Sequence, residues 1–204
     1  IRPFARRVCH HQGNAVLVGT QASEASTAVG GGAQATGALS TALGYGAQAT
    51  GDDSLAAGNK ARATGSFSTA LGDSAWASGA DSTATGAYAW ATADGAAAFG
   101  ASAWATGTNA AAFGSGAWAS GSGATAIGFN SWAPGTSATA VGRGAFGYAA
   151  NSVAVGFQAL GNAGNSIAIG SNSLGASAGS VALGAGAETR GTNAVAIGAG
   201  SQAS

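Results

Sequence analysis

Small apolar and polar residues alternate along this chain in a unit that repeats every 14 residues. Each unit contains a five-residue stretch that ends in glycine, as in Ser152–Gly156 (Ser-Val-Ala-Val-Gly) and Ser166–Gly170 (Ser-Ile-Ala-Ile-Gly). The phasing glycines run from Gly30 to Gly198 in thirteen copies, without insertion or deletion. A fixed short period of this kind predicts a solenoid, in which each repeat forms one turn that stacks on its neighbours.

The first half of each repeat predicts a strand. The residues three and one positions before each glycine share one face of that strand, because they are two apart. They are mostly β-branched or large and apolar, so we expect this face to form the core. Thr83 and Thr85 are the exception, and the weakest core layer is expected there. In the last four repeats the expected core residues are Val153, Val155, Ile167, Ile169, Val181, Leu183, Val195 and Ile197.

The position between the two members of each pair is alanine in all thirteen repeats. We expect this position to point away from the core, where a solvated surface would tolerate many residue types. An unbroken file of alanines therefore indicates that something approaches closely. The chain's own loops could pack there, but a neighbouring subunit is the favoured interpretation. The candidate interface residues are Ala126, Ala140, Ala154, Ala168, Ala182 and Ala196.

The second half of each repeat predicts a second strand, in which alternating alanines point inward and give a thin interior. The residues between these alanines face outward, and all five tryptophans fall at one such phase. The ladder could contact a ligand, pack against a neighbouring subunit, or stiffen the solenoid as a stacked spine. Its members are Trp76, Trp90, Trp104, Trp118 and Trp132, and the same phase continues as Phe146, Leu160 and Leu174.

Gly, Asn, Asp and Ser recur between the two halves of each repeat, as at Asn172 on one side and Asn165 on the other. These residues accept left-handed backbone angles or bond their own backbone, so they predict corners at both edges of a flattened roll. Two strands of about five residues should therefore make up each turn. Stacked turns would be parallel and about 4.8 Å apart.

Composition narrows the function classes. Glycine makes up 37 of 204 residues, charged residues are only 7%, and the formal net charge is zero. This balance argues against nucleic acid or an anionic membrane surface as a partner. No apolar run of about 20 residues is present, so we expect no membrane contact by this chain.

Catalysis, cofactors and metals are not expected. Acid–base chemistry needs converging titratable groups, and the phased array contains no histidine. Residues 1–13 are out of pattern and are predicted to be an irregular lead-in. They contain Cys9, His10 and His11, but a structural zinc site needs four protein ligands and no fourth is nearby.

The motifs Asn151–Gly156, Asn165–Gly170 and Asn193–Gly198, each followed at fixed phase by an alanine-rich half, resemble the head repeats of trimeric autotransporter adhesins, the YadA-like family. The resemblance covers residues 14–204, which we expect to be a single run of head repeats from a longer protein. It implies an all-β, left-handed parallel β-roll that assembles as a homotrimer. It also implies the surface of a Gram-negative bacterium, with a C-terminal outer-membrane anchor outside this fragment.

Two features depart from the family pattern. The tryptophan file occupies a position that looks variable in the family. The second glycine of the repeat is replaced at four positions, which are Ala93, Ala149, Ala163 and Ser177.

The resemblance implies a function in adhesion to host cells or extracellular-matrix molecules. The outward aromatic ladder favours that hypothesis, because exposed apolar strips usually mark interaction sites. A passive spacer that projects another binding region is the alternative. Ice binding is disfavoured, because the outward face pairs threonine with tryptophan instead of a second threonine.

Overall fold

The computed structural model describes residues 20–23 and 25–204. The chain divides into two compact units, Ile1–Ser102 and Ala103–Ser204. The described part of each unit contains β-strands and turns, and no helix there could cross a membrane. The expected irregular lead-in at residues 1–13 and residues 14–19 of the expected head repeats lie outside the described residues. Cys9, His10 and His11 lie outside them too.

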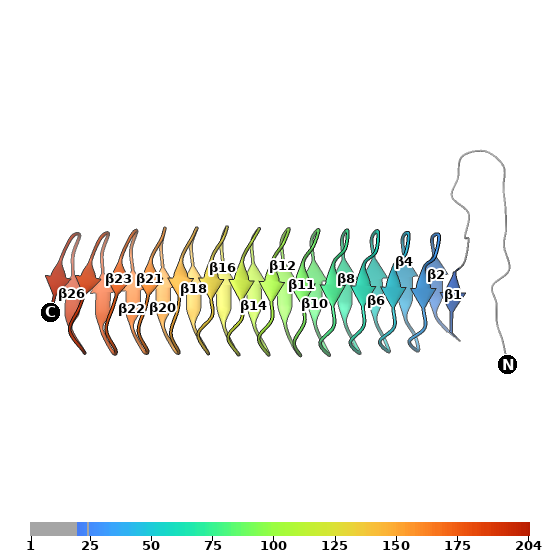
Figure 1. Cartoon of the computed structure of the whole chain (residues 1–204), viewed down its shortest axis with the longest axis horizontal. Helices are drawn as coiled ribbons and strands as arrows, with labels where there is room; N and C mark the ends of the chain where they lie inside the picture. The colour runs from blue at the N-terminus through green and yellow to red at the C-terminus, as the bar shows by residue number, and fades with distance from the viewer. Residues whose placement is uncertain (1–19, 24) are drawn as a thin grey trace. The chain divides into compact units, whose positions relative to one another are not determined.

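The first unit contains two parallel sheets, drawn in blue to green in Figure 1. One sheet is built from three-residue strands: β2 (Thr27–Val29), β4 (Thr41–Leu43), β6 (Leu55–Ala57), β8 (Thr69–Leu71), β10 (Thr83–Thr85) and β12 (Ala97–Phe99). The other is built from two-residue strands: β1 (Gln21–Ala22), β3 (Gln34–Ala35), β5 (Gln48–Ala49), β7 (Arg62–Ala63), β9 (Trp76–Ala77) and β11 (Trp90–Ala91). The chain alternates between the two sheets, which makes this unit a parallel β-solenoid.

The second unit repeats the same arrangement. Its three-residue strands are β14 (Ala111–Phe113), β16 (Thr125–Ile127), β18 (Thr139–Val141), β20 (Val153–Val155), β22 (Ile167–Ile169), β24 (Val181–Leu183) and β26 (Val195–Ile197). Its two-residue strands are β13 (Trp104–Ala105), β15 (Trp118–Ala119), β17 (Trp132–Ala133), β19 (Phe146–Gly147), β21 (Leu160–Gly161), β23 (Leu174–Gly175), β25 (Glu188–Thr189) and β27 (Gln202–Ala203). The strands of each set are again parallel neighbours in one sheet.

Register follows the sequence period. Ala168 pairs with Ala182, and Trp118 pairs with Trp132, so residues 14 apart stack directly in parallel. The expected all-β parallel solenoid is therefore confirmed. The strands are shorter than the five residues expected, because the corners take up the remaining residues of each turn.

The corners lie where glycine, asparagine and aspartate predicted them. Asn165 and Asn172 have left-handed φ values of 57° and 55°, one at each edge of the same turn. The phasing glycine is required for a different reason. Gly170 has a φ of 134°, and a Cβ there would overlap the carbonyl group of Gly184 in the next turn. Glycine therefore allows successive turns to stack closely.

The side chains of the three-residue strands point in the opposite directions from those that we expected. Ala168 and Ala182 have no exposed surface, whereas Ile169 and Leu183 are 37% and 41% exposed. The alanine file (Ala126, Ala140, Ala154, Ala168, Ala182 and Ala196) lies inside the chain's own roll, so its assignment to a subunit interface was wrong. The expected core residues lie on the outside instead: Val153, Val155, Ile167 and Val181 are half-buried, and Ile169, Leu183, Val195 and Ile197 are exposed. Thr83 and Thr85 are likewise not a core layer.

The narrow interior explains this reversal. A Cβ added at Gly161 would lie only 3.0 Å from the Cβ of Ser152 across the roll, and the same holds for Gly175 and Ser166. A valine or isoleucine has no room between such close layers, since protein interiors are already tightly packed. Alanine and serine therefore fill the inside, and large apolar side chains must point out.

A file of buried serines completes the interior and was missed by sequence reasoning. Ser40 donates its hydroxyl hydrogen to the carbonyl oxygen of Gly37 at 2.7 Å. Ser152 does the same to Ala149 at 2.7 Å. These local bonds satisfy hydroxyl groups that would otherwise be costly to bury. The inward alanines expected in the second half of each repeat, such as Ala117 and Ala119, are confirmed as buried.

Candidate binding surfaces

We define the pair face of each unit as the outward side of its three-residue strands. It carries the residues three and one positions before each phasing glycine. None of these residues is charged in the described repeats. In the second unit they include Ile127, Ile169, Leu183 and Ile197, all exposed. The pair face is therefore uncharged. Threonine alternates with apolar residues in the first unit, and exposed apolar residues predominate in the second.

We define the tryptophan face of each unit as the outward side of its two-residue strands. Here the expected ladder forms, and its members are half-buried. In the first unit, the rings of Trp76 and Trp90 meet edge to face at 5.6 Å between centroids. Aromatic pairs at such distances stabilise each other beyond the area that they bury.

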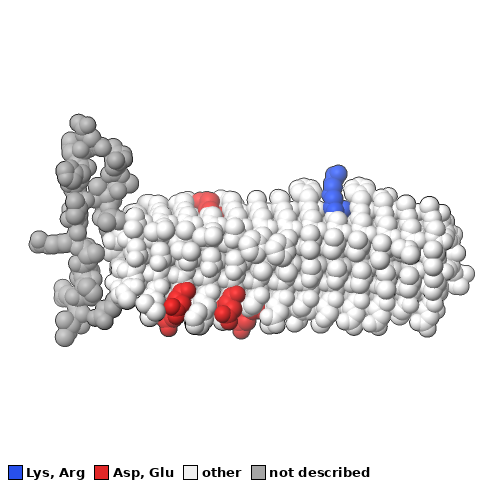
Figure 2. Space-filling view, turned by 180° about the vertical axis from the view of Figure 1, so that it is seen from behind, with Lys and Arg blue, Asp and Glu red and all other residues white. Residues whose placement is uncertain are grey.

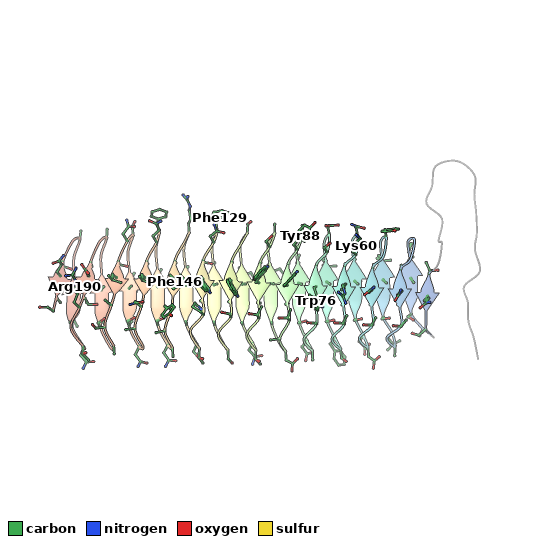
Figure 3. The ribbon with its side chains drawn as sticks, in the orientation of Figure 1. Lys60, Trp76, Tyr88, Phe129, Phe146 and Arg190 are labelled. Atoms are coloured by element: carbon green, nitrogen blue, oxygen red, sulfur yellow. The ribbon has the colours of Figure 1, made fainter. Side chains whose placement is uncertain are left out.

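The ladder of the second unit is longer. Trp104 and Trp118 meet edge to face at 5.4 Å, and Trp118 and Trp132 stack at 5.0 Å with only 8° between their planes. Phe146 continues the file, with its ring centroid 4.6 Å from that of Trp132. Phe146, labelled in Figure 3, lies on β19, which pairs with the strand that carries Trp132. The stacking interpretation of the ladder is thus compatible with its observed geometry.

The indole nitrogens of three ladder residues are covered. The indole Nε1 atoms of Trp76, Trp118 and Trp132 are buried and have no hydrogen-bond partner. The ladder therefore presents aromatic carbon to the solvent and few hydrogen-bond donors. Such a surface suits partners with apolar faces, including flat rings.

Charged residues occur on the tryptophan face, unlike the pair face. The Arg62 guanidinium lies 5.1 Å from the ring centroid of Trp76, a cation–π contact. Glu188 accepts a hydrogen bond from Nε of Arg190 at 2.8 Å, and this contact raises the pKa of Arg190. The two faces of the roll therefore differ in polarity as well as in residue size.

Sequence reasoning missed two hollows beside the tryptophan face of the first unit. The first, about 720 Å³, is lined by Gly31, Gly32, Tyr45, Gly46, Gln48, Lys60 and Arg62. The second, about 380 Å³, is lined by Lys60, Arg62, Ser74, Trp76, Tyr88 and Trp90. Both combine residues from a corner with residues from a strand. The sequence does contain a sign of these hollows. Lys60, Ser74 and Tyr88 share one position of the repeat, two residues after the phasing glycine.

The acidic residues of the first unit have a structural explanation. Asp52 accepts a hydrogen bond from the backbone N–H of Ala38 at 2.9 Å, and Asp94 accepts one from Ala80 at 2.9 Å. Each carboxylate thus ties one corner to the corner of the preceding turn. Figure 2 shows acidic side chains gathered mainly along one edge of this unit. Among residues 20–23 and 25–204, no three acidic, histidine or cysteine side chains converge as a metal site would require.

Stacked turns, an interior of small residues and an apolar outer face define a β-solenoid repeat protein. The model of the YadA head domain repeat matches residues 22–47, 35–61, 63–89, 91–117, 119–145, 148–173 and 177–201. These matches cover most of the chain, which therefore belongs to the YadA head family. The chain is an adhesin-type head domain, of a family whose heads are non-enzymatic binding or structural domains on the surface of the outer membrane.

Among solved structures, the chain is similar to the collagen-binding domain of the Yersinia adhesin YadA. The two are 26% identical, and the match covers 85% of this chain and 69% of the Yersinia chain, with a TM-score of 0.34. The family assignment rests on the repeat matches and not on this superposition. The comparison with curated proteins gave no match.

Proposed function

We propose that this chain is the head of a homotrimeric bacterial surface adhesin that attaches to host cells or to the extracellular matrix. The observation that supports it most strongly is the pair face, which is uncharged in each unit and mostly apolar in the second. Depletion of charge and enrichment in large apolar residues are typical of the centre of a permanent interface between subunits. The proposal places the pair face between subunits and leaves the tryptophan face outward.

The occupant of the pair face is a further copy of the same chain. Every copy carries the same apolar residues at the same spacing of about 4.8 Å per turn, so two copies match along their length. In a closed ring of three, each copy turns its pair face toward the common axis, so no copy leaves this face open to water. Burying one leucine or isoleucine contributes about 1.5–3 kcal/mol, and many such residues lie on this face.

Sedimentation equilibrium over a wide dilution range tests the assembly. We expect a mass three times the 18.9 kDa of the chain, unchanged on dilution. A monomer at every concentration would contradict the homotrimer. It would leave the apolar residues of the pair face unexplained.

Attachment is tested on surfaces coated with matrix proteins. Collagen comes first, because the Yersinia relative is a collagen-binding domain. We expect the double variant W104Q/W118Q to lose attachment and to keep its fold and its mass. The matched control is L160Q/L174Q, which makes the same change on the same face outside the aromatic file. Equal attachment by W104Q/W118Q and by the unmodified chain would exclude the ladder as the adhesive surface.

The second candidate function is a passive spacer that projects another binding region. The stacked rings favour it, because a continuous aromatic file stiffens a thin roll regardless of any ligand. On this hypothesis the chain forms the trimer but binds no matrix protein or host cell. The same attachment assay therefore separates the two functions.

A further inference from the structure

The two hollows of the first unit share one pair of cations. Lys60 stands at a corner and Arg62 on strand β7, two residues later in the chain. Both side chains line both hollows, so the cations flank the boundary between them. Aromatic rings lie beyond them on each side: Tyr45 in the first hollow, and Trp76, Tyr88 and Trp90 in the second.

Glycines at the corner create the first hollow. Gly31, Gly32 and Gly46 line its floor and have no side chains to fill it. The Tyr45 ring packs over Gly31, where a Cβ would lie 3.3 Å from its Cδ2 atom. The Lys60 stem packs over Gly46 in the same way, at 3.6 Å from the Cγ atom. The aromatic wall and the cation of this hollow are therefore held against the corner.

Both cations are available to an external anion. Within the part of the chain that the structure describes, neither Lys60 nor Arg62 forms an ion pair. The Arg62 guanidinium carbon lies 5.1 Å from the ring centroid of Trp76, and a guanidinium that packs on a ring can still donate its N–H groups to an oxyanion. Asp73, the acidic residue of this corner, already accepts a hydrogen bond from Nδ2 of Asn59 at 2.6 Å.

The remaining charges of the first unit lie elsewhere. Asp52 and Asp94 lie at the edge opposite Lys60, where they accept hydrogen bonds from the backbone N–H groups of Ala38 and Ala80. Figure 2 shows acidic side chains of this unit but no lysine or arginine on the face it presents. Figure 3 shows Lys60 and Tyr88 together at the upper edge, beside the strand that carries Trp76. The described cations of the first unit, Lys60 and Arg62, therefore both lie among aromatic rings.

We propose that these hollows form one site for an acidic oligosaccharide. Its carboxylate or sulfate groups would bind Lys60 and Arg62, and its sugar rings would lie against Tyr45, Trp76, Tyr88 and Trp90. A chain of sugars offers flat C–H faces alternating with oxyanions, which matches an aromatic, cationic, aromatic sequence along the roll. Aromatic carbon alone would suit an apolar peptide, but it would not account for two unpaired cations. This inference goes beyond the proposed attachment through Trp104 and Trp118, because it adds a separate site in the first unit with a ligand class of its own.

Calorimetric titration of the full chain tests the site. The probes are a sulfated heparin hexasaccharide, a carboxylated hyaluronan hexasaccharide and the neutral sugar chitohexaose. We expect at least one acidic probe to bind and the neutral probe to bind at least about tenfold more weakly. The preferred acidic probe tells whether sulfate or carboxylate is recognised. Binding should weaken as salt rises, because exposed charges are screened.

Variants localise the binding. K60Q/R62Q should weaken binding of the acidic probe at least about tenfold, and Y88A should weaken it without changing the salt dependence. The matched control is R143Q. Arg143 also lies over an aromatic ring, 5.5 Å from the centroid of Phe157, but its smaller hollow contains no tryptophan and no second cation. R143Q should bind like the unmodified chain.

Three outcomes overturn the proposal: no acidic probe binds, the neutral probe binds equally well, or K60Q/R62Q binds like R143Q. Each outcome is read on chains whose trimer mass and circular dichroism are unchanged. If the chain attaches to a matrix protein but binds no acidic probe, this inference fails and the adhesive function stands. If it also attaches to no matrix protein and no host cell, the adhesive function fails as well.

Discussion

The two outward faces of the roll differ in how their residues vary along the chain. The pair face contains no charged residue in any described repeat and becomes more aliphatic toward β26. The tryptophan face changes from Gln48 and Arg62 through the tryptophans to Leu174 and Glu188 at one and the same phase. An uncharged face suits a partner that repeats in the same way, whereas a face with local charges and rings suits a ligand recognised at one place.

The difference between the two faces shows which positions of the repeat restrict the residue type. The interior accepts only alanine, serine and other small residues, so it cannot distinguish one repeat from the next. The pair face is limited by its proposed burial against a further copy of the chain. The tryptophan face is limited neither by the narrow interior nor by a further copy of the chain, so its residues can differ from repeat to repeat. The following predictions test this contrast.

The largest effect is expected from I169D on the pair face. A charge buried without a partner costs about 3–5 kcal/mol, so the variant should sediment as a monomer. The control L174D makes the same change on the tryptophan face and should keep the threefold mass. Loss of assembly in both variants, or in neither, would contradict the distinction between the faces.

Next comes A168L, which places a larger side chain inside the roll. Overpacking costs about 1–3 kcal/mol, and we expect the upper end because the opposite layer is so close. The matched change I167L lies on the outward side of the same strand and should cost less than about 1.5 kcal/mol. Chemical denaturation gives both values. A168L with the stability of I167L would contradict the inward direction of the alanine file.

A smaller loss is expected from W132L on the tryptophan face. The substitution keeps an apolar side chain but removes the ring contacts with Trp118 and Phe146. Such contacts contribute about 0.5–1.5 kcal/mol beyond area burial. Thermal unfolding should show this loss, and sedimentation should show an unchanged mass. W132F, which keeps a ring, is the control and should restore most of the stability.

The smallest effect is expected from R190Q. It removes the ion pair with Glu188, in which the arginine side chain is 69% exposed. The contact raises the pKa of Arg190, so its contribution is present at neutral pH and is lost only as pH rises through that raised value. Because exposed ion pairs contribute little, thermal unfolding at pH 7 should not change. A clear loss of stability would show that charge on this face has a structural role.

Much of this architecture follows from the sequence by itself. The 14-residue period determined the parallel stacking, because only residues one turn apart fall in register. Glycine and asparagine marked many of the corners, since they adopt left-handed angles readily. The phase of the repeat fixed the others, because Leu39, Phe67 and Tyr88 take left-handed angles at the same positions. The common phase of the tryptophans determined that their rings would meet.

The tertiary structure alone decided which side of the three-residue strands points inward. A period of two defines two faces of a strand, and hydrophobicity favoured Ile169 over Ala168 as the buried residue. The distance between the two layers overruled that preference, because the space between Gly161 and Ser152 admits no larger side chain. The site at Lys60 also required the fold, since a corner and a strand come together there only when the turns stack.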